Sequence, residues 1–212
     1  MTVRLTKVDP IHPDPCAIDD AADILRHGGV VAFPTETVYG LAADAFNKGA
    51  VNRVYEVKGR PESKPLPVQV ANICDVARLS AELPDGARKL INKFFPGPLT
   101  IILRASDQVP EIVTAGTGKV GIRMPDHPVA LAMIHAAGTP IVAPSANTSG
   151  DPPPTSAEEV QAYFDTTIDM ILDGGPSRIR MSSTVVDVSD GALTIIRQGS
   201  ISEEEIRDCL AG

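Results

Sequence analysis

Short strand-like runs rich in Val, Ile and Ala, each stopped by a proline, constrain the fold of this chain most. They are residues 30–33, 120–124 and 141–143, and a proline follows each directly. Proline has no backbone N–H to donate and cannot continue a central strand. The pattern predicts short, buried strands that open abruptly into loops, and such loops often carry the functional side chains of a protein.

Helix patterns alternate with these runs. The clearest is residues 85–95, where apolar side chains follow the i, i+3, i+4, i+7 spacing of one helix face. Further helices are expected at 18–27, 49–58, 127–137, 156–164 and after Ser202, and further strands at 67–71, 99–103, 170–172, 183–188 and 193–196. Capping boxes are predicted at Thr155–Glu158 and Ser202–Glu205.

Strands and helices alternate at first, and strands dominate later. The chain has 212 residues, of which 43% are hydrophobic, enough for one substantial core. We therefore expect a single α/β or α+β domain over residues 1–212, built on a twisted open mixed sheet flanked by helices.

Composition and missing motifs exclude several classes of protein. The net charge of -8 argues against a broad surface that coats nucleic acid. The three cysteines form no CxxC pair, the histidines have no metal-ligand spacing, and Walker A, GxGxxG and GxSxG motifs are absent, so we name no metal ligands. Without an apolar leader or a run of about 18 apolar residues, a soluble cytoplasmic protein is expected, away from membranes.

Uncharged polar residues follow the strand ends. Ser145 and Asn147 lie two residues apart, so an extended backbone would point both to one side as a binding pair. A plain turn is the alternative. Thr35, with Glu36 and Thr37, follows another strand end and is either part of a site or a locally hydrogen-bonded turn.

Cations recur near the same places. Lys58 and Arg60 flank a glycine at a helix end, where they either cap the helix or clamp an oligophosphate, with Lys64 as a third charge on the loop. Arg123 lies inside a strand, either in a structural salt bridge or in a bidentate grip on a carboxylate or phosphate. Arg197 follows a strand and is most simply a solvated charge.

Ser183 stands in a run of hydroxyl residues that begins a strand, where hydroxyls usually cap or pair. The recurrence of such groups at strand ends nevertheless predicts a single cleft lined by hydroxyls, an amide and several cations. Its natural ligand is small, polar and anionic.

Six motifs together resemble the YrdC-like family. They are residues 33–41 (FPTETVYGL), 58–61 with 64–66, 95–100 (FPGPLT), 120–125 (VGIRMP), 143–150 (APSANTSG) and 183–187 (STVVD). They occur in the family's order and span nearly the whole chain, residues 33 to 201, so the joint match is highly specific.

The resemblance implies a concave basic cavity and the activity of a threonylcarbamoyl-AMP synthase. Such an enzyme is a nucleotidyltransferase that converts L-threonine, bicarbonate and ATP, accompanied by Mg²⁺, into threonylcarbamoyl-AMP and pyrophosphate. A downstream threonylcarbamoyl transferase complex then modifies tRNA. The alternative is a non-catalytic paralogue that binds RNA or assists ribosome maturation, and weak binding of tRNA or double-stranded RNA fits either reading.

The resemblance also assigns residues by motif position. Catalysis would fall to Lys58, Arg60, Ser145 and Asn147; ATP would contact these four together with Lys64, Lys119 and Arg197; threonine would contact Thr35, Arg123, Ala143 and Ser183, with Arg123 on its carboxylate. Three residues depart from the usual family pattern, namely Lys64, Gln69 and Pro153. From this resemblance, the chain is expected to lack the extra C-terminal domain of longer members.

Overall fold

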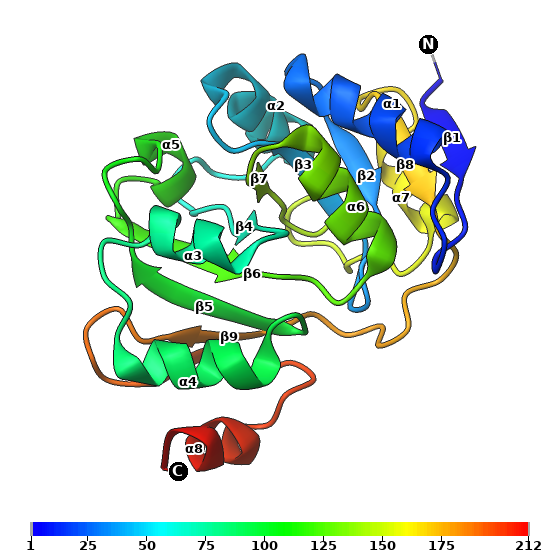
Figure 1. Ribbon diagram of the computed structural model, residues 1–212. Coiled ribbons are helices and arrows are strands. Elements are labelled where there is room, and N and C mark those ends of the chain that lie inside the picture. The colour runs from blue at the N-terminus through cyan, green and yellow to red at the C-terminus, as the bar shows by residue number, and fades with distance from the viewer. Residues whose placement is uncertain (1, 212) are drawn as a thin grey trace.

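A ten-stranded mixed sheet forms the centre of the computed structural model, which describes residues 2–211 (Figure 1). The strands are β1 Arg4–Lys7, β2 Val31–Phe33, β3 Gly40–Asp44, β4 Val68–Gln69, β5 Leu99–Arg104, β6 Lys119–Arg123, β7 Ile141–Val142, β8 Met170–Asp173, β9 Thr184–Asp187 and β10 Thr194–Arg197. Their order across the sheet is β1-β8-β2-β3-β7-β4-β6-β5-β9-β10. Both parallel and antiparallel neighbours occur, so the predicted mixed sheet is confirmed.

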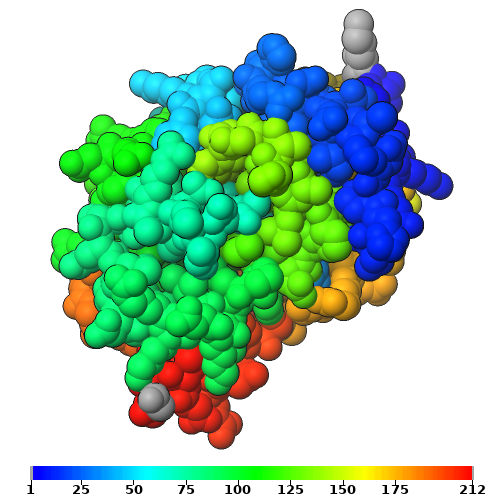
Figure 2. Space-filling model, in the orientation of Figure 1, coloured from blue at the N-terminus to red at the C-terminus, as the bar shows by residue number. Residues whose placement is uncertain are grey.

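Eight helices surround the sheet within the described residues. They are α1 Pro15–Arg26, α2 Lys48–Lys58, α3 Ile73–Leu79, α4 Asp85–Phe94, α5 Glu111–Thr114, α6 Pro128–Ala137, α7 Ala157–Phe164 and α8 Glu203–Ala211. Helices α1 and α6 pack together over β2, β3 and β8 and bury one apolar cluster there. Figure 1 shows α3 and α4 across the β6–β5–β9 part, with α8 outside α4. In Figure 2, α8 forms the lower end of the molecule.

Four elements were not expected from the sequence, namely β1, β3, α3 and α5. Strand β3 shows why, because its Gly-Leu-Ala-Ala-Asp sequence has little intrinsic strand preference. Its first four residues are fully buried, so no alternation of polar and apolar side chains marks it. Its pairing with β2 and β7 makes it a strand through tertiary contacts.

One predicted capping box is misplaced by one residue. Ser156 caps α7, because its hydroxyl accepts from the N–H of Glu159. The carboxylate of Glu159 in turn accepts from the N–H of Thr155 at 2.6 Å, so the box at Thr155–Glu158 is wrong. The second box is confirmed, since Ser202 and Glu205 exchange reciprocal side-chain to backbone hydrogen bonds.

Within the described residues, none of the helices is both long and apolar enough to cross a membrane.

Candidate functional site

A cavity of about 430 Å³ lies against one face of β5, β6 and β9. The alternation of each strand creates it. Val120 and Ile122 of β6 face the core, while Lys119, Gly121 and Arg123 face the cavity. The neighbouring strands alternate in register, and their cavity-facing residues are Thr100, Ile102, Val185 and Asp187. The cavity floor is therefore a sheet that packs one face on the core and carries polar and apolar side chains on the other.

Seven of the predicted site residues line this cavity, and four do not. Those that line it are Arg60, Lys119, Arg123, Ala143, Ser145, Ser183 and Arg197. Those outside the lining are Thr35, Lys58, Lys64 and Asn147. One cavity thus brings together seven of these eleven residues, four of them cationic, and each of the four exceptions has a local cause.

Lys58 is buried and holds a loop. Its side chain is at the end of α2, and its Nζ donates to the carbonyl oxygens of Ser145 and Asn147, both at 2.5 Å. Burial, with a smaller contribution from Arg60, lowers the pKa of Lys58 to about 8. Its ammonium therefore supports the loop that borders the cavity and does not face the cavity itself.

Arg60 diverges from Lys58 because the glycine between them adopts a left-handed conformation. Gly59 ends α2 with φ 57°, a conformation that glycine adopts at little cost. The Arg60 guanidinium reaches the carbonyl oxygens of Lys64 at 3.2 Å and Pro65 at 2.8 Å, at the cavity wall. Lys64 thus contributes its backbone there.

Ser145 and Asn147 do not form a pair on one side of an extended strand. The N–H of Asn147 bonds to the carbonyl of Ser145 at 3.0 Å, so the backbone turns between them. Ser145 lines the cavity, whereas the amide of Asn147 donates to Thr148 at 2.7 Å and Asp151 at 2.8 Å. The expectation that both point to one side is wrong, because the chain bends directly after the strand.

Thr35 forms a locally hydrogen-bonded turn, which was the alternative to a role in the site. Its hydroxyl donates to the carbonyl of Val38 at 2.6 Å and lies 2.9 Å from the hydroxyl of Thr37. With 1% of its surface exposed, Thr35 shapes the segment that leads to the cavity residue Tyr39.

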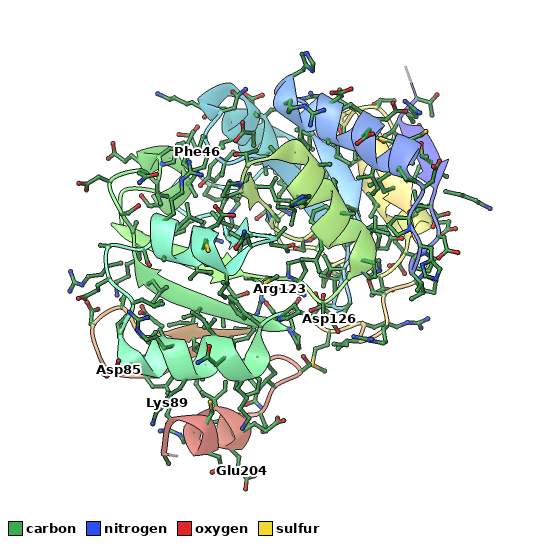
Figure 3. The ribbon with its side chains drawn as sticks, viewed as in Figure 1. Phe46, Asp85, Lys89, Arg123, Asp126 and Glu204 are labelled. Atoms are coloured by element: carbon green, nitrogen blue, oxygen red, sulfur yellow. The ribbon has the colours of Figure 1, made fainter. Side chains whose placement is uncertain are left out.

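Arg123 forms a structural salt bridge and also lies in the cavity lining. It forms an ion pair of 2.7 Å with Glu36, and its Nε donates to the carbonyl of Gly97 at 3.1 Å. The side chains of Arg123 and Glu36 are only 6% and 1% exposed. Arg123 nevertheless belongs to the cavity lining, so a side chain paired with Glu36 also borders the cavity. Figure 3 labels Arg123 at the end of β6.

Arg197 is an exposed charge at a strand end, as expected, and it also lines the cavity. The register of β10 against β9 shifts between Ile195 and Arg197, and this irregularity re-aims the side chain. Its guanidinium donates to the carbonyl of Ser183 at 2.9 Å and to the Ser183 hydroxyl at 3.2 Å. Burial, followed by the nearby charge of Arg123, lowers the pKa of Arg197. The two arginines thus gather positive charge at one end of the cavity.

Lys119 lies along the same strand face as Arg123, two positions before Gly121. Its Nζ contacts the carboxylates of Asp187 at 3.0 Å and Asp190 at 2.7 Å. These hydrogen bonds, which Lys119 donates to Asp190 and, with a smaller effect, to Asp187, raise the pKa of Lys119. Sequence reasoning missed Asp187, although its alternate position in β9 marks it as facing the same way as Ser183.

A second cavity of about 540 Å³ lies on the other side of the Arg123–Glu36 pair. Glu36 and His127 line it, and an ion pair of 2.7 Å joins Arg178 to Asp126 at its rim. Burial lowers the pKa of His127. In residues 2–211, no group of three or more His, Cys, Asp and Glu side chains could hold a metal ion.

Comparison with known proteins identifies the family to which this fold belongs. A family model for Sua5, YciO and YrdC proteins, described as "Telomere recombination", matches residues 23–199. The chain belongs to the Sua5/YciO/YrdC family. It is 50% identical to a threonylcarbamoyl-AMP synthase of Bacillus subtilis over 190 residues, which cover 89% of this chain and 55% of the relative.

Other members of the Sua5/YciO/YrdC family agree with this placement. A threonylcarbamoyl-AMP synthase of Halorhodospira halophila is 39% identical over 84% of this chain and 93% of the relative. The crystal structure of Pyrococcus abyssi Sua5 complexed with L-threonine superposes with a TM-score of 0.94, at 42% identity, over 97% of this chain and 60% of the solved one. The chain thus spans a little over half the length of the first relatives it matches.

Proposed function

We propose that this protein is a threonylcarbamoyl-AMP synthase, a nucleotidyltransferase that uses L-threonine, bicarbonate and ATP. The observation that carries the proposal is one cavity bordered by four cationic side chains, in a chain 50% identical to a synthase of that name. The four cations are Arg60, Lys119, Arg123 and Arg197. They suit substrates that carry a carboxylate and a triphosphate.

The reaction needs no covalent enzyme intermediate. The threonine amine attacks the carbon of bicarbonate, an N–C bond forms, and a C–OH bond breaks as hydroxide leaves with an amine proton as water. A carbamate oxygen then attacks the α-phosphorus of ATP, and the bond to the pyrophosphate oxygen breaks. Catalysis rests on positioning and on neutralising the triphosphate charge. Mg²⁺ enters with ATP as part of the substrate and keeps most of its waters.

The residues that line the cavity can be assigned to the two larger substrates. We assign the threonine carboxylate to Arg123, with Ala143 and Ser183 beside it. We assign the nucleotide and its phosphates to Arg60, Lys119, Ser145 and Arg197. Lys58, Asn147 and Thr35 then act by holding the segments that border the cavity, and Lys64 acts through its backbone.

The deciding experiment measures pyrophosphate release from ATP by the purified protein, with threonine and bicarbonate omitted in turn. We expect release only when both are present. ATP binding with no release under any condition contradicts the synthase proposal and favours a silent paralogue, for which RNA binding is then measured. An active synthase also requires a partner that transfers the threonylcarbamoyl group to tRNA, because its product is an activated adenylate.

Gly121 offers a test that this cavity is the site. It stands in the floor between Lys119 and Arg123, where a Cβ atom would lie 3.3 Å from the Thr100 methyl carbon. Thr100 must shift by a few tenths of an ångström, but valine suits a strand, so Gly121→Val is expected to fold with a modestly lowered unfolding midpoint. Its side chain projects into the ligand space and is expected to weaken ATP and threonine binding at least about tenfold, a loss of roughly 1.4 kcal/mol. Calorimetric titration of each ligand checks this, and unchanged affinities would place the site elsewhere.

A further inference from the structure

Asp187 holds the ammonium of Lys119 from the floor of the cavity. Both residues belong to the cavity lining, although they lie on β9 and β6, with β5 between those strands. The Oδ2 of Asp187 accepts a hydrogen bond from the Nζ of Lys119 at 3.0 Å. Its Oδ1 accepts from the N–H of Ser189 at 2.9 Å and from the Ser189 hydroxyl at 2.6 Å. Because one oxygen is bound twice, the carboxylate is fixed and its other oxygen stays directed at Lys119.

A second carboxylate on the same ammonium, that of Asp190, has a structural reason to be there. Lys119 lies directly opposite Arg104 in the register of β5 and β6, and like charges in that position repel each other. Asp190 contacts both cations at 2.7 Å and offsets the repulsion, and it lies outside the cavity lining. Within the described residues, Asp187 makes an ion pair only with Lys119. Repulsion between the two strands therefore does not explain Asp187.

The two carboxylates leave the ammonium with one N–H to offer. A lysine ammonium can donate three hydrogen bonds, and Lys119 gives one to Asp187 and one to Asp190. The third N–H is available to a ligand in the cavity. A free lysine side chain has many rotamers, and fixing it in advance removes an entropy cost that ligand binding would otherwise include. Lys119 is thus a directed donor that is ready before the ligand arrives.

The charges around this donor cancel. Lys119 and Arg104 are cations, Asp187 and Asp190 are anions, and together they form one contiguous group. A phosphate therefore meets an N–H donor there without excess positive charge. This matters for a reaction that forms pyrophosphate, because an enzyme that holds its product too tightly is limited by product release.

We propose that Asp187 is a positioning residue that fixes the Lys119 ammonium for the nucleotide phosphates and limits how tightly this ammonium holds pyrophosphate. The inference rests on the proposed function, since it assumes that Lys119 meets the phosphates of ATP. A residue that only supported the fold would weaken phosphate binding when altered. Asp187 is expected to do the opposite, because its removal leaves a less compensated cation beside the phosphates.

Asp187→Asn removes the charge and keeps an oxygen that can accept from Ser189, so its unfolding midpoint is expected to change little. Calorimetric titration with pyrophosphate and Mg²⁺, without threonine or bicarbonate, is expected to show affinity about threefold tighter. A single turnover with the protein in excess over ATP is expected to be about tenfold slower. Product release does not limit a single turnover, so its rate reports positioning, whereas the pyrophosphate affinity reports the limit on binding.

Lys119→Met shows whether Asp187 acts through Lys119. In this background Asp187→Asn is expected not to lower the single-turnover rate further, because the ammonium that it positions is gone. The matched control is Asp20→Asn, which removes a carboxylate paired with Arg4 outside the cavity lining and is expected to change neither measurement.

Two results would overturn the positioning role. They are an unchanged single-turnover rate in Asp187→Asn and an equal fall in the Lys119→Met background. Unchanged or weaker pyrophosphate binding by Asp187→Asn would overturn the limit on product affinity. Pyrophosphate binding is measured without turnover. A protein that never forms pyrophosphate therefore contradicts the proposed reaction, while the effect of Asp187 on pyrophosphate affinity is still tested.

Discussion

Removing the Arg123 guanidinium is expected to weaken threonine binding about 100-fold while ATP affinity stays within a fewfold. A charge-assisted, two-pronged bond to a carboxylate contributes about 1.5–3 kcal/mol, or about 10- to 150-fold in affinity, and the expected factor lies in the upper part of that range. The affinity of each ligand is measured separately by titration. Equal losses for threonine and ATP would show that Arg123 does not serve the amino acid in particular.

The buried partner of Arg123 dictates how this variant is made. Arg123→Ala alone leaves the Glu36 carboxylate buried without its cation, at a cost of about 3–5 kcal/mol in stability. Arg123→Met combined with Glu36→Gln removes both charges. The unfolding midpoint of this double variant is expected to be close to that of the unaltered protein. Glu36→Gln alone, with Arg123 intact, is the control for the loss of the ion pair. The double variant separates the loss of binding from the loss of folding.

Replacing Lys58 by methionine is expected to lower the free energy of unfolding by about 2–4 kcal/mol. Two carbonyl oxygens, of Ser145 and Asn147, lose their donor, and each unsatisfied buried acceptor costs about 1–3 kcal/mol. The substitution also removes a buried charge, and this gain in stability offsets part of the cost. For a domain of this size the unfolding midpoint falls by roughly 5–15 °C. ATP affinity is expected to fall too, because the loop that carries Ser145 loosens, and an unchanged midpoint would contradict the bracing role.

The lowered pKa of Lys58 predicts that the stability of the protein depends on pH, and it sets the direction of that change. Burial lowers the pKa of Lys58 from 10.5 to about 8, so between these values the unfolded chain holds a proton that the folded chain has released. Stability relative to Lys58→Met therefore rises as pH increases through this window, by up to about 1.4 kcal/mol per pH unit. Below pH 8 the difference is flat. Urea unfolding of both proteins from pH 7 to pH 10 measures it.

The sequence predicted what depends on local pattern. The proline-stopped runs became β2, β6 and β7, and the amphipathic stretch at 85–95 became α4. Strand alternation also places Arg123 on the cavity side, although only the structure shows that it also pairs with Glu36. These features depend on residues that are close together in the sequence, and so they can be predicted from the sequence.

The features that were missed depend on backbone irregularities and distant contacts. Asn147 turns away from the cavity because one short hydrogen-bonded turn follows Ser145. The burial of Lys58 depends on a loop almost ninety residues further along the chain. Asp187 was missed because its carboxylate meets Lys119 only once β9 and β6 are assembled on either side of β5.

The register shift beside Arg197, which borders the cavity, has a second consequence, for self-association. Strand β10 is an outer edge of the sheet, and a regular outer edge offers a row of free N–H and C=O groups to which another chain can add a strand. The irregularity between Ile195 and Arg197 breaks that row, and the arginine places a charge on it. The device that supplies a cation to the cavity thus also makes this edge a poor template for aggregation.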